Sequence, residues 1–471
     1  MRPLRLPSRL IAVLGVIGLA ACSPGPDYVR PDVETPGAFK EAGQWKVAAA
    51  DDPVVEEKWW KVFKDPLLDE LAERVAIDNQ NLKVAEAQYR AARAALDSAR
   101  AGLFPTATGN LSKMRGTAAS SGAGKAPTTD TYTLSAAVSW EIDVWGRIRR
   151  SVESADAKLA ASAADLAAAR LSTQALLAQT YVQLRAAETQ LLLLRQTVTA
   201  YARFLQLTRN RLEAGVASPL DVAQAETQMA NAEAQAIDLE NQRAQLEHAI
   251  AVLIGKPPAA VALPAEGSLP PVPAAPALLP SALLENRPDI AAAERRMAAA
   301  NAEIGVAQAA FFPVLDLTGN AGYRNSVLAN LITAPSRFWS LGPALALTLF
   351  DGGARSAAVE QASAGYDQAV ATYRQTVLTA FQEVEDNLAA ARLLAQESEA
   401  QARARAAARR SREIAENQYR AGTVSALNVV TAQTSELSAD IAAITLHSRR
   451  LQAAVQLFKN AGGRWSMPVE Q

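Results

Sequence analysis

The chain has 471 residues, and its 47 lysines and arginines nearly balance its 48 aspartates and glutamates. The resulting formal net charge of −1 gives no sign of a nucleic-acid-binding surface. Aromatic residues make up only 6% of this alanine-rich chain, which favours closely packed helices over a thick layered core. The two histidines, His248 and His447, lie within helical patterns and form no metal-binding spacing. Without a nucleophile motif or a phosphate-binding glycine loop, we expect neither an enzyme nor a cofactor-binding protein.

The N-terminus has the pattern of a lipoprotein signal peptide. Basic residues precede an apolar run at 10–19 that is too short to span a membrane as a helix. Leu19-Ala20-Ala21-Cys22 follows and matches the bacterial lipobox, which predicts removal of residues 1–21 and acylation of Cys22, for example with palmitate. Ser23 favours the outer membrane over the inner one. The alternative is a plain secretory signal with a chance cysteine. Cys22 is the only cysteine, so no internal disulfide can form.

Helical periodicity dominates the rest of the chain. The proline-rich stretch 22–68, with Trp59-Trp60 near its end, predicts an acylated arm laid over the body. One helix is expected at 67–102, and a much longer one at 148–212 is followed by a return helix at 219–254. At about 1.5 Å per residue the long helix would reach roughly 100 Å. Its apolar residues alternate spacings of three and four, as in a coiled coil, at Leu184, Ala187, Leu191, Leu194, Val198, Tyr201, Leu205, Thr208 and Leu212.

A strand of unusual character precedes the long helix. The stretch YTLSAAVSWEI, residues 132–142, alternates apolar and small polar residues over about 11 positions, the length of a tilted membrane strand. Residues 103–113 predict a partner strand, and the Gly- and Ser-rich segment 114–130 predicts the loop between them.

The whole pattern occurs twice. Phe104-Pro105 recurs as Phe312-Pro313, Asp143 as Asp351, and Gly215 as Gly422, with a nearly constant shift. The sequence therefore predicts an internal two-fold repeat. Its parts are repeat 1 at 69–255 with a β-hairpin at about 103–143, a proline-rich connector at 256–288, repeat 2 at 289–463 with a β-hairpin at about 312–351, and a tail at 464–471. The strands of the second hairpin are expected at 314–323 and 341–351.

Four bilayer-length strands cannot close a barrel by themselves, and an open edge in lipid leaves backbone groups unpaired. If the strands span a membrane, oligomerisation is required: a dimer gives eight strands with a filled interior, and a trimer gives twelve with room for a water-filled bore. A soluble sheet is the alternative, although no other segment supplies a second layer to cover it. Aromatic residues at the strand ends are typical of a membrane girdle and are Tyr132, Trp140, Tyr323, Trp339 and Phe350.

Several motifs together resemble the TolC-like outer-membrane factor family, and more closely its OprM/NodT-type lipoprotein branch. The resemblance covers essentially the whole mature chain. It rests on Trp59-Trp60 with Phe63 and Asp65-Pro66, and on the following stretches: WEIDVWGR at 140–147, ENRPDIAAAERRMAAANAEIGVAQAAFFP at 285–313, LFDGGARS at 349–356 and NAGGRW at 460–465.

This resemblance implies a mainly α-helical homotrimer with a twelve-stranded membrane β-barrel, continued by a long periplasmic α-helical barrel. Such proteins are passive outer-membrane exit ducts. They work with a periplasmic membrane-fusion adaptor and an inner-membrane transporter, usually of the RND type, and export drugs, metals or other small molecules. A periplasmic coiled-coil adaptor or structural lipoprotein is the competing interpretation, but it has no use for bilayer-length alternating strands.

In that family the two helix-turn-helix tips close the periplasmic end and contact the adaptor. The matching residues here are Arg211, Gly215, Ser218, Asp221, Tyr419, Gly422, Ser425, Asn428 and Thr431. The resemblance implies that Asp221 and Tyr419 help to constrict the pore. Ser218, Pro219 and Asp221 also spell a helix cap, and the glycines are typical helix terminators, so a purely structural role stays open. Relatives often carry acidic residues where this chain has Asn428 and Thr431, which argues against an acidic ring from the second tip.

Overall fold

The computed structural model describes residues 24–42, 58–117, 128–274 and 286–461. The predicted signal peptide, Cys22 and the C-terminal tail lie outside these residues. The chain forms two compact units: residues 1–32, 88–163 and 292–374 make the first, and residues 33–87, 164–291 and 375–471 make the second. The backbone of both long helices continues from one unit into the other.

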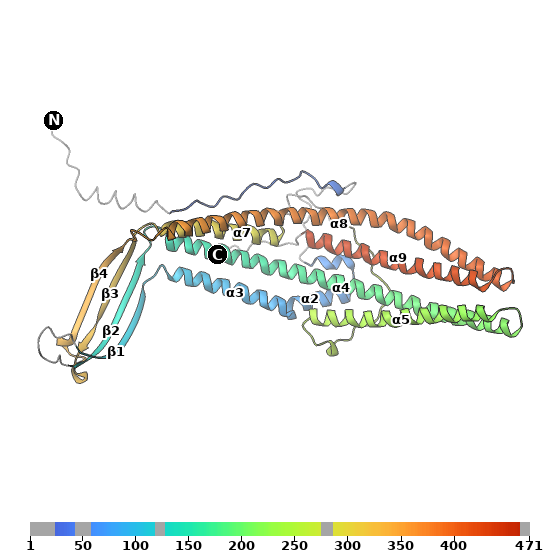
Figure 1. Cartoon of the computed structure of the whole chain (residues 1–471), viewed down its shortest axis with the longest axis horizontal. Helices are drawn as coiled ribbons and strands as arrows, with labels where there is room; N and C mark the ends of the chain where they lie inside the picture. Colours follow the sequence, from blue (N-terminus) through green and yellow to red (C-terminus); the bar gives the residue numbers. More distant parts are fainter. Residues whose placement is uncertain (1–23, 43–57, 118–127, 275–285, 462–471) are drawn as a thin grey trace, which may run out of the picture. The chain divides into compact units, whose positions relative to one another are not determined.

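The first unit contains a four-stranded antiparallel sheet in the order β1-β2-β3-β4 (Figure 1). Its strands are β1 (Thr106–Thr117), β2 (Thr128–Ile142), β3 (Val314–Asn325) and β4 (Arg337–Ala346). The two β-hairpins come from the two repeats, and β2 pairs with β3 over 11 residues, from Tyr132↔Asn325 to Ile142↔Leu315. The repeats therefore contribute equally to one sheet.

Several strand boundaries differ from the prediction. β1 continues to Thr117 and β2 begins at Thr128, so the predicted loop 114–130 is too long; cross-strand pairs such as Arg115↔Asp130 extend the ladder. β4 covers Arg337–Ala346 in place of the predicted 341–351. Its start is fixed by pairing with Tyr323, and β3 ends the ladder at Val314↔Ala346, so Leu347, Leu349 and Phe350 lie beyond the strand.

The long helices match each other in length. α4 (Arg147–Glu213) and α8 (Ala354–Arg420) each have 67 residues, and their return helices α5 (Pro219–Leu253) and α9 (Ala426–Asn460) each have 35. We call α4–α5 the first helical hairpin and α8–α9 the second (Figure 1). Residues at the predicted coiled-coil positions of α4, such as Leu184, Leu194 and Tyr201, are buried. This burial confirms the predicted coiled-coil stripe, the apolar positions spaced by three and four. The helix lengths confirm the internal repeat.

A single helix predicted at 67–102 is in fact two, α2 (Pro66–Asp78) and α3 (Gln80–Ala101). The break is at Asn79, whose backbone is extended with ψ 125° and whose side chain is buried. Its amide donates to the carbonyl of Leu253 at 2.7 Å and accepts from the backbone N–H of Leu82 at 3.1 Å. Asn79 thus ends one helix and caps the next while binding the end of α5, a tertiary contact that periodicity does not reveal.

The core of the second unit gathers segments far apart in sequence. Trp59, Trp60 and Phe63 of the short helix η2 (Trp59–Phe63) are buried with Phe458 of α9, and the rings of Trp59 and Phe458 stack 6.3 Å apart. Connector residues such as Leu263 and Leu269 pack on the same cluster. A short helix, η3 (Pro258–Ala260), interrupts the connector, which was predicted to have no regular structure. The arm and the connector are therefore anchored to the helical body.

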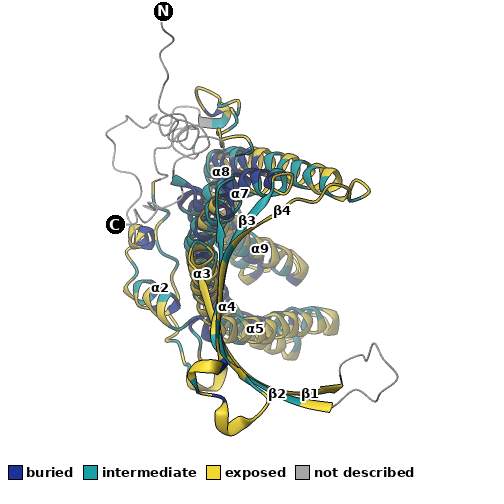
Figure 2. Ribbon diagram, turned by 90° about the vertical axis from the view of Figure 1, so that its left-hand side faces the viewer, coloured by how far each residue is buried: buried dark blue, intermediate teal, exposed yellow. Residues whose placement is uncertain are grey.

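The remaining α-helix of repeat 2 is α7 (Pro288–Ala309), which belongs to the first unit from residue 292 onward. Over the described part of the chain, none of the helices combines the length and apolarity needed to cross a bilayer. Figure 2 shows that the strands carry mostly exposed and intermediate residues, whereas the buried residues concentrate on the helices.

Candidate functional site

Cross-strand pairing gives the sheet one apolar face. Directly paired residues of an antiparallel ladder point to the same side. Leu134 of β2, for example, pairs with both Leu111 and Tyr323, and Val138 is in register with Gly319 and Leu341. The large apolar side chains on this face are Leu111, Tyr132, Leu134, Val138, Trp140, Ile142, Leu315, Leu317, Tyr323, Trp339, Leu341 and Leu345, and charged residues such as Arg115 and Arg337 lie on it toward the loop ends. Leu341 is 68% exposed and Trp339 74%, so a broad apolar surface is uncovered in the single chain.

The opposite face is mostly polar in β1, β2 and β3, and in β4 it carries Ser340 among Phe338, Gly342, Ala344 and Ala346. Its polar side chains include Thr106, Thr108, Asn110, Ser112, Thr133, Ser135, Ser139, Glu141, Asp316, Thr318, Asn320, Arg324 and Ser340. At one end Glu141 pairs directly with Asp316, and Arg147 at the start of α4 donates two hydrogen bonds to Glu141, at 2.9 and 2.6 Å. A sheet that is apolar on one side and polar on the other can separate lipid from water.

Two tryptophans bind backbone carbonyls near the junctions between strands and helices. Trp140 donates from Nε1 to the carbonyl of Leu103 at 2.9 Å, and Trp145 donates to that of Pro313 at 2.8 Å. The Trp145 ring stacks on Phe312 with centroids 4.9 Å apart. Of the predicted girdle residues, Tyr132, Tyr323 and Trp339 lie on the sheet face already described, toward the loop ends. Phe350 lies after β4 and is 88% exposed.

The turn of the first helical hairpin is capped by its own side chains. Gly215 adopts φ 74°, the left-handed conformation that ends α4. Ser218 then caps α5: its hydroxyl accepts from the backbone N–H of Asp221 at 3.2 Å. The Asp221 carboxylate accepts from the backbone N–H and the hydroxyl of Ser218, each at 2.9 Å. Asp221 is therefore engaged as the acid of a capping box.

The turn of the second hairpin lacks this box. Gly422 has φ 77° and ends α8 in the same way. Ser425 precedes α9, but its side chain makes no capping hydrogen bond, and Asn428 stands where the first turn has its acid. Thr431 donates within its own helix to the carbonyl of Leu427 at 2.8 Å. The Thr423 hydroxyl donates to the carbonyl of Gln418 at 3.0 Å, so the side-chain cap is on the α8 end of this turn.

The two hairpins meet at Arg211 and Tyr419. Arg211 Nη1 donates to the backbone carbonyl of Tyr419 at 3.0 Å, and its guanidinium lies 4.6 Å from the centre of the Tyr419 ring. That ring is buried, with its centre 5.4 Å from the Phe204 ring and its hydroxyl 3.5 Å from Thr208 Oγ1. The structure therefore brings together two of the predicted tip residues in one contact between the repeats. Phe204 was not predicted, and the only sequence signal for it is an aromatic beside the coiled-coil stripe.

Next to this contact, Arg412 of α8 is surrounded by acids. It pairs with Glu416 at 3.0 Å and with Glu436 of α9 at 2.5 Å. Burial raises the pKa of Glu436 above its usual value, the neighbouring Asp440 adds to the effect, and Arg412 opposes it. The second hairpin thus carries a partly buried carboxyl that accepts a proton more readily than a free glutamate.

A further site that sequence reasoning missed holds the start of the arm in the first unit. Arg150 on α4 binds the carbonyls of Pro24 and Gly25 at 3.3 and 3.4 Å and the Asp27 carboxylate at 2.9 Å. Gly25 has φ 98°, and a Cβ there would lie 2.6 Å from the Cα of Gly305 in α7. Gly25 and Gly305 lie far apart in the chain, so no local sequence pattern reveals this approach.

Comparison with known proteins gives a consistent result. The family model "outer membrane efflux protein" matches the chain twice, at residues 71–256 and 279–463. The chain is 34% identical to a probable efflux pump outer membrane protein, TtgC of Pseudomonas putida, over 95% of this chain and 93% of that protein. It is also 34% identical to outer membrane protein OprJ of Pseudomonas aeruginosa, covering 96% and 95% of the two chains. Its fold is similar to that of the outer-membrane channel OprN, with a TM-score of 0.86 and 32% identity over 94% of this chain and 100% of that one.

Proposed function

This chain belongs to the outer membrane efflux protein family, and we propose that three copies of it close into the exit duct of a tripartite efflux system. Its place is the outer membrane, and its helices extend the duct into the periplasm. The duct is passive and carries out no catalytic step. Small molecules such as drugs or metals would leave the periplasm or the inner-membrane pump through it.

The observation that carries this proposal is the two-faced sheet with two open edges. β1 and β4 are its outer strands, and they run in opposite directions in the order β1-β2-β3-β4. The β4 edge of one copy therefore meets the β1 edge of the next as an antiparallel pair. Repeating this contact satisfies the edge backbone groups that lipid cannot. Three sheets of four strands give a twelve-stranded barrel, apolar outside and polar inside.

The acylated anchor is the second part of the proposal. The described chain begins at Pro24, two residues after the predicted lipidation site at Cys22. Pro24, Gly25 and Pro26 are each held through their carbonyls, by Arg150 and Asn301 near the helix ends that adjoin β2 and β3. Such a fixed segment suits a protein whose lipid enters the same membrane as its barrel. We expect Cys22→Ser to abolish acylation without dissolving the trimer, because the barrel also holds the bilayer. A soluble, monomeric Cys22→Ser protein would contradict the barrel.

The hairpin turns are the proposed gate and partner surface. The Arg211–Tyr419 contact holds the second hairpin against the first, which supports a resting state with the hairpins drawn together. A periplasmic membrane-fusion adaptor would contact the turns, and an inner-membrane transporter of the RND type would supply the energy. We also propose that Asp221 helps to constrict the pore. Its carboxylate would then serve both the pore and the capping box, in which the structure engages it.

One charge placed on either face of the sheet tests the duct. Leu341 lies on the apolar face at mid-strand, and its neighbour Ser340 lies on the polar face, paired with Asn320. Arginine on a lipid face near the midplane costs roughly 2–4 kcal/mol. Leu341→Arg should therefore lower the yield of membrane-inserted trimer, and Ser340→Arg should preserve it while changing ion conductance.

The measurements are native mass spectrometry of the purified oligomer and single-channel recording in planar bilayers. Equal trimer yields for the two variants would show that the apolar face does not meet lipid. If neither the wild type nor the Arg211→Ala variant, in which the hairpin contact is removed, forms pores, the coiled-coil adaptor is favoured instead.

A further inference from the structure

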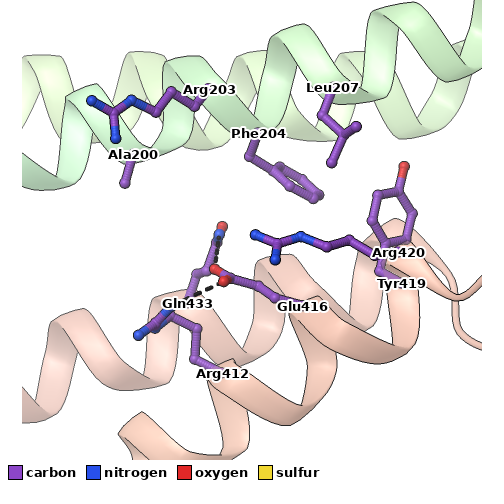
Figure 3. A pocket seen from close by; sticks show the side chains of 9 residues that line it. All are labelled: Ala200, Arg203, Phe204, Leu207, Arg412, Glu416, Tyr419, Arg420 and Gln433. Carbon is purple, nitrogen blue, oxygen red and sulfur yellow. Dashed lines mark hydrogen bonds and ion pairs between the residues drawn. The ribbon is translucent and has the colours of Figure 1, made fainter.

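A pocket of about 220 Å³ lies between the two helical hairpins, beside the Arg211–Tyr419 contact. One wall comes from α4 and the other from α8 and α9 of the second hairpin (Figure 3). The residues that line it are Ala200, Arg203, Phe204, Leu207, Arg412, Glu416, Tyr419, Arg420 and Gln433. All of them belong to the second compact unit.

The walls differ in chemistry. Ala200, Phe204 and Leu207 give α4 an apolar side, and Leu207 is 37% exposed. The opposite wall carries Arg412, Glu416 and Gln433, joined by hydrogen bonds. Figure 3 shows the Arg420 side chain extending from α8 into the space between Phe204 and Glu416. A ligand would thus meet an aromatic surface on one side and polar groups on the other.

The charges of the lining do not cancel. The guanidinium of Arg412 is already shared by Glu416 and Glu436. Within the described chain, neither Arg203 nor Arg420 pairs with a carboxylate. Two guanidinium groups therefore remain available to a negatively charged group, and a guanidinium can bind a carboxylate through two parallel hydrogen bonds.

The buried side chain of Gln433 is a second, independent indication of a ligand. Its side chain is 4% exposed, and its Nε2 donates to Glu416 Oε1 at 3.1 Å. Because an ionised carboxylate only accepts hydrogen bonds, Glu416 fixes the orientation of the amide. Oε1 of Gln433 is then left buried without a donor in the chain. Buried acceptors usually have a hydrogen-bond partner. A ligand in the pocket could supply the donor that Gln433 Oε1 lacks.

We propose that this pocket binds a small, flat organic anion. Its carboxylate pairs with Arg420, the positive charge of Arg203 on the opposite wall adds to the attraction, its ring packs on Phe204 and Leu207, and an N–H or O–H group donates to Gln433 Oε1. The cavity is smaller than the roughly 300 Å³ at which drug-sized sites begin, so the ligand is a compact molecule of one or two rings. Because the ligand touches α4 and α8 together, it stabilises the arrangement in which Arg211 holds Tyr419.

Indole-3-acetate combines the three features in one probe: a carboxylate, a flat ring and an N–H donor. Isothermal titration calorimetry of the full-length protein in lipid nanodiscs should give one saturable site per chain. Indole-3-acetamide, which lacks the charge, should bind at least tenfold more weakly. 1-Methylindole-3-acetate, which lacks the donor, should bind several-fold more weakly.

Substitutions of the lining residues test whether indole-3-acetate binds in this pocket. Arg203→Gln with Arg420→Gln should weaken indole-3-acetate at least tenfold, whereas Arg410→Gln, an exposed arginine of α8 outside the lining, should not. In Gln433→Met the preference for the unmethylated probe should disappear. Circular dichroism and native mass spectrometry establish that each variant is folded and assembled.

Three results would overturn the proposal: no saturable binding by the wild type, equal binding of acetate and acetamide, or an unchanged affinity in the double arginine variant. Single-channel recording on the same preparations separates these outcomes from failure of the duct. Pores without indole-3-acetate binding would reject the pocket alone.

Discussion

The two helical hairpins come from the two copies of the repeat, but their turns are stabilised by different contacts. In the first, Ser218 and Asp221 cap α5 reciprocally, so the turn is stabilised by its own residues. In the second, Ser425 makes no such bond, Thr423 caps only the end of α8, and Tyr419 is held by Arg211 of the other hairpin. Local capping persists wherever the hairpin moves, whereas a contact between hairpins is lost when they separate. We infer that the second turn is the more responsive to opening.

Removing the Tyr419 ring should have the largest effect on this difference. The ring is buried against Phe204, and truncating a buried aromatic residue typically costs about 3–5 kcal/mol. Tyr419→Ala should therefore reduce the local unfolding free energy of the second turn, measured by hydrogen exchange with mass spectrometry, and raise single-channel conductance. Leu212→Ala, at the equivalent position before Gly215, is the matched control and should leave the second turn protected. Equal loss of protection in both turns would contradict the asymmetry.

Breaking the Arg211 contact alone should have a smaller effect. A hydrogen bond from a charged donor contributes about 1.5–3 kcal/mol, and Arg211 also contacts the face of the Tyr419 ring. Arg211→Ala should expose the second turn to exchange and increase conductance, while the capping box keeps the first turn protected. Gln418→Ala, the counterpart four residues before Gly422, should not change conductance. Unchanged conductance in Arg211→Ala would show that this contact does not hold the duct closed.

Removing or adding a capping side chain should change the local unfolding free energy of its turn by about 1 kcal/mol. Ser218→Ala removes a working cap and should accelerate exchange at the start of α5, whereas Ser425→Ala, whose side chain caps nothing, should have little effect at α9. Asn428→Asp should install the missing acid of the box and protect the second turn. A similar response to both serine substitutions would mean that Ser425 caps its helix in solution.

The smallest expected effect is a pH response confined to the second hairpin. The pKa of Glu436 is raised by burial, so the folded hairpin binds a proton more tightly than the unfolded chain. This contribution to stability is full below the unfolded pKa and is lost as pH rises through the folded one. Protection of α9 near Glu436, corrected for intrinsic exchange rates, should therefore increase as pH falls from neutrality toward 5.

Glu436→Gln should remove that pH response and give the acid-like protection at neutral pH. The first repeat has Met229 at the equivalent position, so α5 supplies an internal reference without a titrating group there. A matching pH step in α5 would assign the response to other carboxyls.

Much of the architecture could be predicted because it depends on local patterns. Alternation along 132–142 fixed which residues of β2 share a face, and the register shows the same faces continuing through β3 and β4. The spacing of Gly215 and Gly422 located both turns, and each glycine adopts the left-handed conformation expected of a helix terminator. The predicted end of β4 was wrong. Leu347 and Leu349 continue the apolar alternation, but β3 begins at Val314 and offers them no residue to pair with.

The sequence by itself determined the duplication, because matching landmarks recur at a nearly constant shift along the chain. It also determined the hairpin turns, the two-faced strands and the capping box, since each depends on residues only a few positions apart. Tertiary structure alone decided that Asn79 divides a helix by binding Leu253, that Arg150 and Gly305 receive the arm, and that Arg211 selects Tyr419. These contacts join residues far apart in the chain. Periodicity shows which face of a helix is buried but not which distant segment covers it, because many apolar partners satisfy the same face and only packing selects one.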